Sequence, residues 1–192
     1  MDFFNIMIKL LKILLWPLLF LLSLSIIISC LNFYGYGLTY QYSQSVRPGW
    51  YFKKPINKTI YKGEMVLFNP DKKLDRFIAS RGWKKEGVPL LKKVVGVPGD
   101  KICLKGNDFL INNNKIAEIK KYDSKHRLLP NYWRDKDVSI KYRIGFKSPG
   151  CFLLNKSEYL VLGLHSKDSF DSRYFGPISS KLIKYQAIDI FG

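Results

Sequence analysis

The stretch Pro89–Ile102 reads P-L-L-K-K-V-V-G-V-P-G-D-K-I, an apolar run that carries two lysines and ends at a Gly-Val-Pro-Gly-Asp turn. The pattern predicts a β-strand. Successive strand residues point to opposite faces, so Lys92 and Lys93 face opposite sides, and one ammonium group is expected on a buried, apolar face. Burial lowers the pKa of a lysine, and its neutral amine is a competent general base near neutral pH. The alternative from this stretch alone is an edge strand whose lysines extend into solvent.

The composition is that of a globular chain with a strongly basic balance. Of 192 residues, 47% are hydrophobic and 15% aromatic, enough for a packed core, and the formal net charge is +17. Nucleic-acid binding is disfavoured because the sequence has no recognition helix, zinc spacing or Gly-rich phosphate loop. Three cysteines are too few for a disulfide scaffold, and His126 and His165 have no metal-ligand companions. No metal or cofactor is therefore expected.

An uncharged apolar run, Ile13–Phe33, is long enough to cross a bilayer as a helix, which takes about 20 residues. Lys9 and Lys12 precede it, so the positive-inside rule keeps residues 1–12 in the cytoplasm. The sequence thus predicts a short cytoplasmic tail, a transmembrane anchor over residues 13–33, and an exported domain over residues 34–192.

A cleaved signal peptide is the alternative to an anchor. Ile27–Cys30 loosely resembles a lipoprotein cleavage box, and a lipid on Cys30 would then replace the helix. The apolar run is long for the hydrophobic region of a signal peptide, which favours the anchor. In both cases the rest of the chain is tethered to the outer side of a membrane.

Most of the exported part reads as short strands separated by turn residues. The basic, Gly-containing segment Asp71–Gly87 is expected to be a loop, and the anchor is the only helix expected. The predicted fold class is therefore mainly β. Strands are expected at residues 38–44, 50–53, 64–68, 90–96, 101–104, 108–112, 115–118, 151–154, 158–163 and 185–190.

Four segments follow the apolar run in a fixed order. They are Ser43–Ser45 with a Pro-Gly turn and Tyr51 after it, Gly63–Val66, Lys92–Asp100, and Asp168–Pro177. This series resembles the signal peptidase I family of membrane-anchored serine peptidases, which has S-x-S, a G-D-I-V-like strand, K-R-V-V-G-x-P-G-D and D-S-x-D-S-R-Y-x-G after its anchor. One segment alone is a weak signal, whereas four in series are specific and cover nearly the whole exported part.

The resemblance implies a Ser/Lys catalytic pair, because a serine hydroxyl needs a base to act as a nucleophile. It makes Ser45 the nucleophile and Lys92, four residues before Gly96, the base; alternation alone could not choose between the two lysines. Ser43 matches the residue whose hydroxyl joins the Ser45 backbone N–H as an oxyanion donor.

The last segment supplies the implied supporting residues. Ser169 matches the serine that orients the lysine amine. Asp171 and Arg173 match an acidic and basic pair, interpreted here as a scaffold for that serine in preference to a direct catalytic role.

The sequence departs from the family pattern at two places. After the nucleophile, the usual S-x-P-x-G becomes S-V-R-P-G, with Arg47 and Pro48 exchanged, so the turn and the substrate pockets are expected to differ. The last segment is preceded by Gly-Leu-His, ending at His165, where the family has G-D-N or G-D-H. This leaves open a Ser-His-Asp arrangement of His165 with Ser45 and Asp171, although the lysine strand would then have no role.

The resemblance also implies antiparallel sheets in a barrel-like domain, curled around a shallow groove that takes an extended substrate by strand addition. Residues 103–150 correspond to the family's variable insert. Its basic, aromatic part, Glu118–Lys147, either faces lipid headgroups or substrate or is a solvated excursion.

The small size, the S-F-D-S-R-Y-F-G-P form and the Gly150-Cys151 pair look most like the TraF branch of conjugative-transfer peptidases. Cys103 and Cys151 are a candidate disulfide, because exported cysteines tend to be oxidised and that branch often has cysteines at such places.

The resulting hypothesis is a membrane-bound serine endopeptidase that removes leader peptides from exported precursors. In its narrower form it matures a conjugative pilin and can close the pilin chain. The expected location is the bacterial inner membrane, with the catalytic domain on the periplasmic side. Expected partners are membrane lipids, the precursor or pilin, and conjugative secretion machinery, without nucleic acid. The alternatives are a general signal peptidase I and a non-catalytic, membrane-tethered factor of a secretion or conjugation apparatus.

Overall fold

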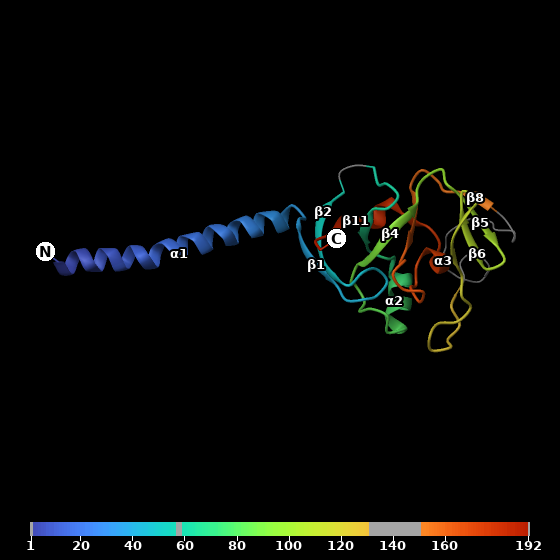
Figure 1. Cartoon of the computed structure of the whole chain (residues 1–192), viewed down its shortest axis with the longest axis horizontal. Coiled ribbons are helices and arrows are strands. Elements are labelled where there is room, and N and C mark those ends of the chain that lie inside the picture. Colours follow the sequence, from blue (N-terminus) through green and yellow to red (C-terminus); the bar gives the residue numbers. More distant parts are fainter. Residues whose placement is uncertain (1, 57–58, 131–150, 192) are drawn as a thin grey trace. The chain divides into compact units, whose positions relative to one another are not determined.

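The computed structural model describes residues 2–56, 59–130 and 151–191. The chain consists of two compact units, Met1–Gly37 and Leu38–Gly192 (Figure 1). The first unit is helix α1 (Asp2–Phe33), and within it Met7–Phe33 is long and apolar enough to cross a membrane. The residues expected to form a separate tail are helical from Asp2 onward.

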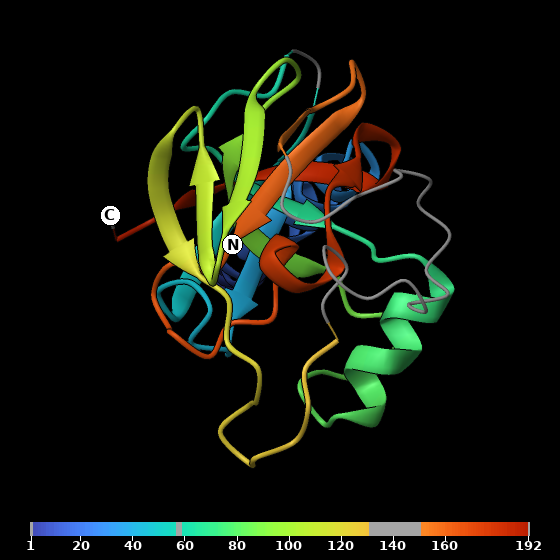
Figure 2. The same cartoon turned by 90° about the vertical axis from the view of Figure 1, so that its right-hand side faces the viewer.

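The second unit contains two sheets. Within the described residues, seven strands form the larger sheet in the order β1-β2-β11-β3-β4-β9-β10, and four strands form the smaller one in the order β7-β6-β5-β8. Figure 2 shows the hairpins of the smaller sheet in front of the larger sheet. The larger sheet consists of β1 (Gly37–Gln41), β2 (Gly49–Pro55), β3 (Met65–Phe68), β4 (Leu90–Gly96), β9 (Glu158–Leu162), β10 (Ile178–Ser179) and β11 (Ile183–Asp189). The smaller sheet consists of β5 (Lys101–Lys105), β6 (Asp108–Ile111), β7 (Asn114–Glu118) and β8 (Cys151–Leu153).

The predicted mainly antiparallel β fold is confirmed. The pairings of β4 with β3 and β9, and of β5 with β6 and β8, are all antiparallel. The strand expected over residues 38–44 ends at Gln41, because the chain turns at residues 43–46. The two-residue strand β10 was not predicted, since so short a run has no detectable alternation.

The loop predicted over Asp71–Gly87 is wrong for its first half, which forms helix α2 (Lys72–Ser80). Asp71 caps this helix by accepting hydrogen bonds from two backbone N–H groups of the first turn. Leu74 and Ile78, four residues apart, point the same way and are buried. The surrounding lysines and arginines gave the segment the composition of a loop, although its cap and spacing were those of a helix.

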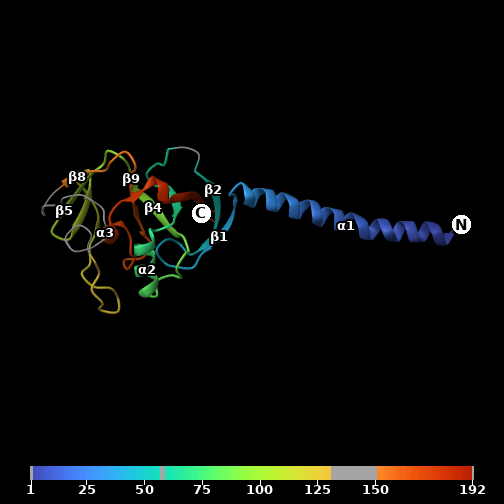
Figure 3. The ribbon, with the colours of Figure 1, turned by 180° about the vertical axis from the view of Figure 1, so that it is seen from behind.

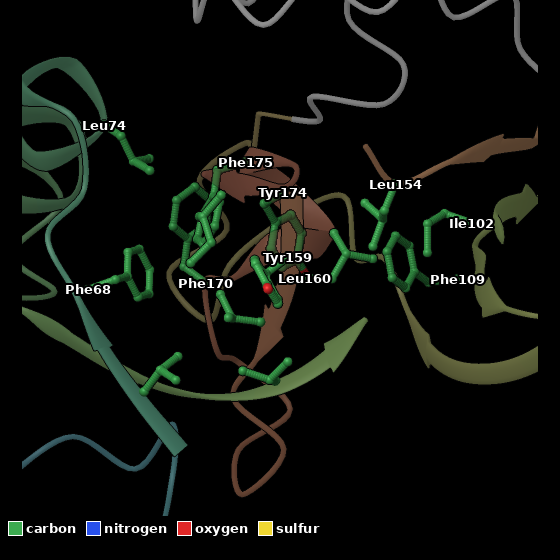
Figure 4. Packing of buried hydrophobic residues seen from close by; sticks show 14 of the residues in the cluster. Phe68, Leu74, Ile102, Phe109, Leu154, Tyr159, Leu160, Phe170, Tyr174 and Phe175 are labelled. Carbon is green, nitrogen blue, oxygen red and sulfur yellow. The ribbon is translucent and has the colours of Figure 1, made fainter. Parts of the chain in front are cut away.

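One apolar cluster connects the two sheets. Strands of both sheets contribute to it, and in Figure 4 Leu154 and Leu160 lie beside Phe109 and Ile102. Burial of this shared cluster, at roughly 25 cal/mol per Å² of apolar surface, holds the sheets together. A smaller cluster covers the opposite face of the larger sheet and consists of Val46, Tyr51, Leu67, Leu91 and Ala187.

The variable insert expected over residues 103–150 begins with strand structure, since β5, β6 and β7 occupy it to Glu118. Beyond β7, Ile119 and Leu129 are buried in the larger cluster, whereas most residues between them are exposed. Arg81 donates to the Leu128 carbonyl, which ties this part to the segment after α2. The remainder of the insert, residues 131–150, lies outside the described residues.

The turn between β4 and β5 joins the two sheets. Asp100 is buried there, and its carboxylate accepts hydrogen bonds from Lys62 Nζ at 2.8 Å, the Val97 backbone at 2.8 Å and Asn112 Nδ2 at 2.8 Å. These partners come from the approach to β3, from the turn itself and from the β6–β7 turn. The Pro-Gly-Asp motif therefore fixes how one sheet continues into the other. Strand β4 lies inside the larger sheet, between β3 and β9, and Figure 3 shows β4 and β9.

Candidate active site

Lys92 is buried in the middle of the larger sheet. Its neighbour across the ladder is Val66 of β3, and both lie on the face of the larger apolar cluster. Only 2% of Lys92 is exposed, whereas Lys93 is exposed on the opposite face. Lys92 Nζ donates to Ser169 Oγ at 2.7 Å. Burial lowers the pKa of the Lys92 ammonium from 10.5 to about 8, against a smaller opposing effect of the Asp171 carboxylate.

Ser169 is held by its backbone and by the aromatic residue that follows it. Its carbonyl accepts from Arg173 Nη2 at 3.1 Å, and its N–H donates to the Ser166 carbonyl at 3.3 Å. The neighbouring Phe170 ring stacks on Tyr174, with centroids 5.4 Å apart, and lies close to Phe175 (Figure 4). This anchoring points the Ser169 hydroxyl at the lysine amine.

Asp171 and Arg173 form a buried ion pair beneath Ser169. The Asp171 carboxylate accepts from Arg173 Nε and Nη2, each at 2.8 Å, in the paired geometry typical of arginine and carboxylate. It also accepts from the Gly163 backbone N–H at 3.0 Å and caps helix α3 (Ser172–Phe175). Arg173 Nη1 reaches the Glu118 carbonyl at the end of β7. The pair therefore links the segment that carries Ser169 to β9 and to the smaller sheet.

The turn that carries Ser45 is fixed at three points. The adjacent Val46 is buried in the smaller cluster, and the Tyr51 hydroxyl donates to the Arg47 carbonyl at 2.7 Å. The Ser45 carbonyl accepts from the His165 backbone N–H at 3.2 Å. Ser45 itself is half-buried. A turn held this firmly presents a serine in a defined position.

Gly163 brings the Ser45 turn next to the lysine site. A Cβ at this position would lie 2.8 Å from the Ser45 carbonyl oxygen and closer still to Ser169 Oγ, the partner of Lys92. Only glycine lets the two segments approach so closely. The structure thus gathers around Gly163 the backbone of Ser45 and the side chain of Ser169, whose hydroxyl accepts from Lys92. Ser45, Lys92 and Ser169 come from three distant parts of the sequence.

The family of the chain follows from a match along nearly its whole length. The family described as signal peptidase, peptidase S26, matches residues 8–189. The chain belongs to this family. Among curated relatives, "Signal peptidase I V" of Bacillus subtilis is 30% identical over 132 residues, which cover 66% of this chain and 63% of the relative. "Signal peptidase IB" of Staphylococcus aureus is 30% identical over 126 residues, 64% of this chain and 56% of the relative. The chain thus spans less than two thirds of the length of these relatives.

Among solved structures, a signal peptidase I from Enterococcus faecalis V583 is 17% identical to this chain. The alignment covers 66% of this chain and 94% of that one, with a TM-score of 0.34.

The departures from the signal peptidase I pattern have visible structural counterparts. Arg47, exchanged with Pro48, reaches the C-terminal strand, where Nη1 lies 3.9 Å from Asp189 Oδ2. His165 is exposed and holds Ser45 through its backbone N–H, while the Asp171 carboxylate is bonded to Arg173 and Gly163. The Asp171 carboxylate that a Ser-His-Asp arrangement would use is thus taken up by these two partners.

Ser43 and two of the cysteines have partners of their own. Ser43 is exposed in the turn after β1, and its Oγ accepts from Gln41 Nε2. Cys103 of β5 and Cys151 of β8 are opposite each other in the smaller sheet and form a disulfide, with Cα atoms 4.2 Å apart. Cys30 in α1 is a free, exposed thiol.

Sequence reasoning missed the structural part that three residues play around this candidate site. Gly163 was noted only as part of a departure from the pattern, although a glycine between a buried strand and a polar segment suggests close backbone approach. Tyr51 was used as a motif marker, and its hydroxyl bond to the Ser45 turn could not be foreseen. Gln41 had no sequence signal, because it lies in a run of tyrosines expected to continue as a strand.

Proposed function

We propose that this chain is a membrane-bound serine endopeptidase that removes leader peptides from exported precursor proteins. The observation that carries the proposal is the buried Lys92 amine, with a pKa lowered to about 8 and a hydrogen bond to Ser169, beside the turn that carries Ser45. Membership of the signal peptidase, peptidase S26, family supports it.

The proposed reaction starts from the neutral form of Lys92. Its Nζ donates one N–H to Ser169 Oγ, so the lone pair is free to take the proton of Ser45 Oγ. The Ser45 oxygen then attacks the scissile carbonyl carbon, and the resulting oxyanion is bound by the Ser45 backbone N–H and the Ser43 hydroxyl. Collapse breaks the C–N bond, and the Lys92 ammonium returns its proton to the leaving amine. A water molecule, deprotonated by Lys92, hydrolyses the acyl-enzyme and regenerates Ser45.

Asp171 and Arg173 act in this proposal through structure. Their ion pair fixes the Ser169 carbonyl and the Gly163 N–H, so it keeps the hydroxyl that orients Lys92 in position. Asp171 is a positioning residue, since its carboxylate is bonded to the Arg173 guanidinium and to the Gly163 N–H.

The proposed location is a bacterial inner membrane, with α1 as a single-pass anchor over residues 13–33 and the catalytic domain, residues 34–192, on the periplasmic side. The apolar helix Met7–Phe33 supports the anchor. Lys9 and Lys12 before the uncharged run support the orientation.

The narrower proposal is maturation of a conjugative pilin, with release of the acyl-enzyme by water or by an internal amine that closes the pilin chain. It rests on the resemblance of the last sequence segment to the TraF branch and on the Cys103–Cys151 pair. A general signal peptidase I fits the names of the curated relatives at least as well. A pilin precursor and a general secretory precursor, offered in parallel to the same enzyme, separate the two.

The catalytic proposal is tested with purified full-length protein in detergent and a precursor that ends its leader in Ala-x-Ala. Ser45→Ala and Lys92→Met should lose cleavage by at least about 10³-fold. Lys93→Met, one residue away on the exposed face, should retain it. The parental rate should rise with pH and level off above about 8, as Lys92 loses its proton. Equal cleavage by Ser45→Ala and the parent would exclude Ser45 as the nucleophile, whereas no cleavage by the parent would favour a non-catalytic, membrane-tethered factor.

A further inference from the structure

Gln41, the last residue of β1, reaches over the turn to Ser43. Its Nε2 donates to the Ser43 carbonyl at 3.1 Å and also to Ser43 Oγ. Gln41 is half-buried, whereas Ser43 is exposed. The two bonds come from one amide nitrogen, so the Ser43 backbone and hydroxyl are held together by a single side chain.

The two acceptors define the direction of the Ser43 hydroxyl. A carbonyl oxygen only accepts hydrogen bonds, so the group of Gln41 that faces it must be the NH₂ and not the amide oxygen. The Ser43 Oγ beside the same NH₂ therefore accepts, and its own proton must point elsewhere. A free serine hydroxyl would rotate and could donate to nearby backbone carbonyls.

We propose that Gln41 is a positioning residue that keeps the Ser43 hydroxyl available as a hydrogen-bond donor to the substrate oxyanion. The proposal rests on the peptidase function above and on the oxyanion role of Ser43. Gln41 acts only through Ser43, because its NH₂ donates to the Ser43 oxygen and so turns the Ser43 proton away from Gln41. Its effect should appear in the transition state, where the negative charge develops, and not in the binding of the uncleaved substrate.

The test is a double-mutant cycle on the full-length protein, with a fluorogenic leader peptide ending in Ala-x-Ala as probe. Gln41→Leu should lower kcat by roughly threefold to tenfold with KM unchanged, the scale of one hydrogen bond. Ser43→Ala should lower kcat more, by about 10²-fold. In the Ser43→Ala background, Gln41→Leu should have no further effect, because the hydroxyl that it orients is gone.

Two variants separate positioning from a general disturbance of the turn. Gln44→Leu makes the same chemical change at the exposed residue next to Ser43 and should leave kcat at the parental value. Gln41→Glu keeps the size but offers only acceptors, so Ser43 should donate to it and kcat should fall at least as far as in Gln41→Leu. Multiplicative losses in the double mutant, an effect on KM alone, or a parental kcat in Gln41→Leu would each overturn the proposal. Parental activity in Ser45→Ala would instead exclude Ser45 as the nucleophile and so overturn the Ser/Lys mechanism on which the proposal rests.

Discussion

At the scale of one residue, the burial of the Lys92 ammonium lowers the free energy of unfolding. The pKa of its ammonium is about 8 in the folded chain and 10.5 as an ordinary value, so the unfolded chain holds the proton over a range where the folded chain has released it. Between these pH values the free energy of unfolding therefore rises with pH, and below about pH 8 the full cost of burial is present. Lys92→Met should consequently be more stable than the parent at pH 7, by up to roughly 3 kcal/mol. The gap should close as the pH approaches 10.5, which urea unfolding at a series of pH values will measure.

The neighbouring lysine provides the matched control for this effect. Lys93 is exposed on the other face of the same strand, so Lys93→Met should leave the pH dependence of unfolding unchanged between pH 8 and 10.5. If Lys92→Met and the parent have parallel stability curves over that range, the lowered pKa of Lys92 is wrong.

At the scale of the element, helix α2 depends on its N-cap residue, Asp71. This cap is recognisable in the sequence, but the basic composition of the segment suggested a loop. The Asp71 carboxylate accepts from the backbone N–H groups of Lys73 and Leu74 at 3.0 and 2.9 Å. Asp71→Ala should lower the free energy of unfolding by about 1 kcal/mol, the usual contribution of such a cap, and equilibrium denaturation is the measurement. Asp71→Asn, which also caps well, should remain within a few tenths of a kcal/mol of the parent. An equal loss in both variants would mean that the charge and not the cap stabilises α2.

How far the sequence predicts an element depends on whether its signal is local. Strand β4 was predicted with its observed bounds, and alternation correctly put Lys92 and Lys93 on opposite faces. Which lysine is buried depends on how β3 and β9 pair with β4, so the family pattern was needed to choose. The approach of Ser45 to Ser169 across Gly163 depends on three segments meeting, and no local pattern encodes such a contact. The contact of Gln41 with Ser43 was missed because the local strand pattern was extended to residue 44, through residues that form a turn.

At the scale of the whole molecule, hydrogen bonds connect the chain at and after the end of β7 to the segment that follows Ser169. Arg173 Nη1 bonds the Glu118 carbonyl at 3.3 Å, and the Lys120 N–H donates to the Tyr174 hydroxyl at 3.2 Å. The Cys103–Cys151 disulfide closes the chain across a separation of 48 residues that includes β6 and β7. Lys92, Ser169 and the Ser45 turn lie outside that closed segment. The disulfide is thus expected to stabilise the fold without shaping the site.

The double substitution Cys103→Ser/Cys151→Ser should therefore lower the free energy of unfolding by about 2–4 kcal/mol, because the open chain gains conformational freedom when unfolded. Cleavage measured well below the melting temperature should stay within about twofold of the parent, since the Lys92–Ser169 bond belongs to the larger sheet. Cys30→Ser, which removes only the free thiol of α1, should change neither quantity, and reduction of the parent should reproduce the double variant. A loss of cleavage with stability intact would mean that the smaller sheet positions Arg173, and through it Asp171 and Ser169, more directly than these contacts indicate.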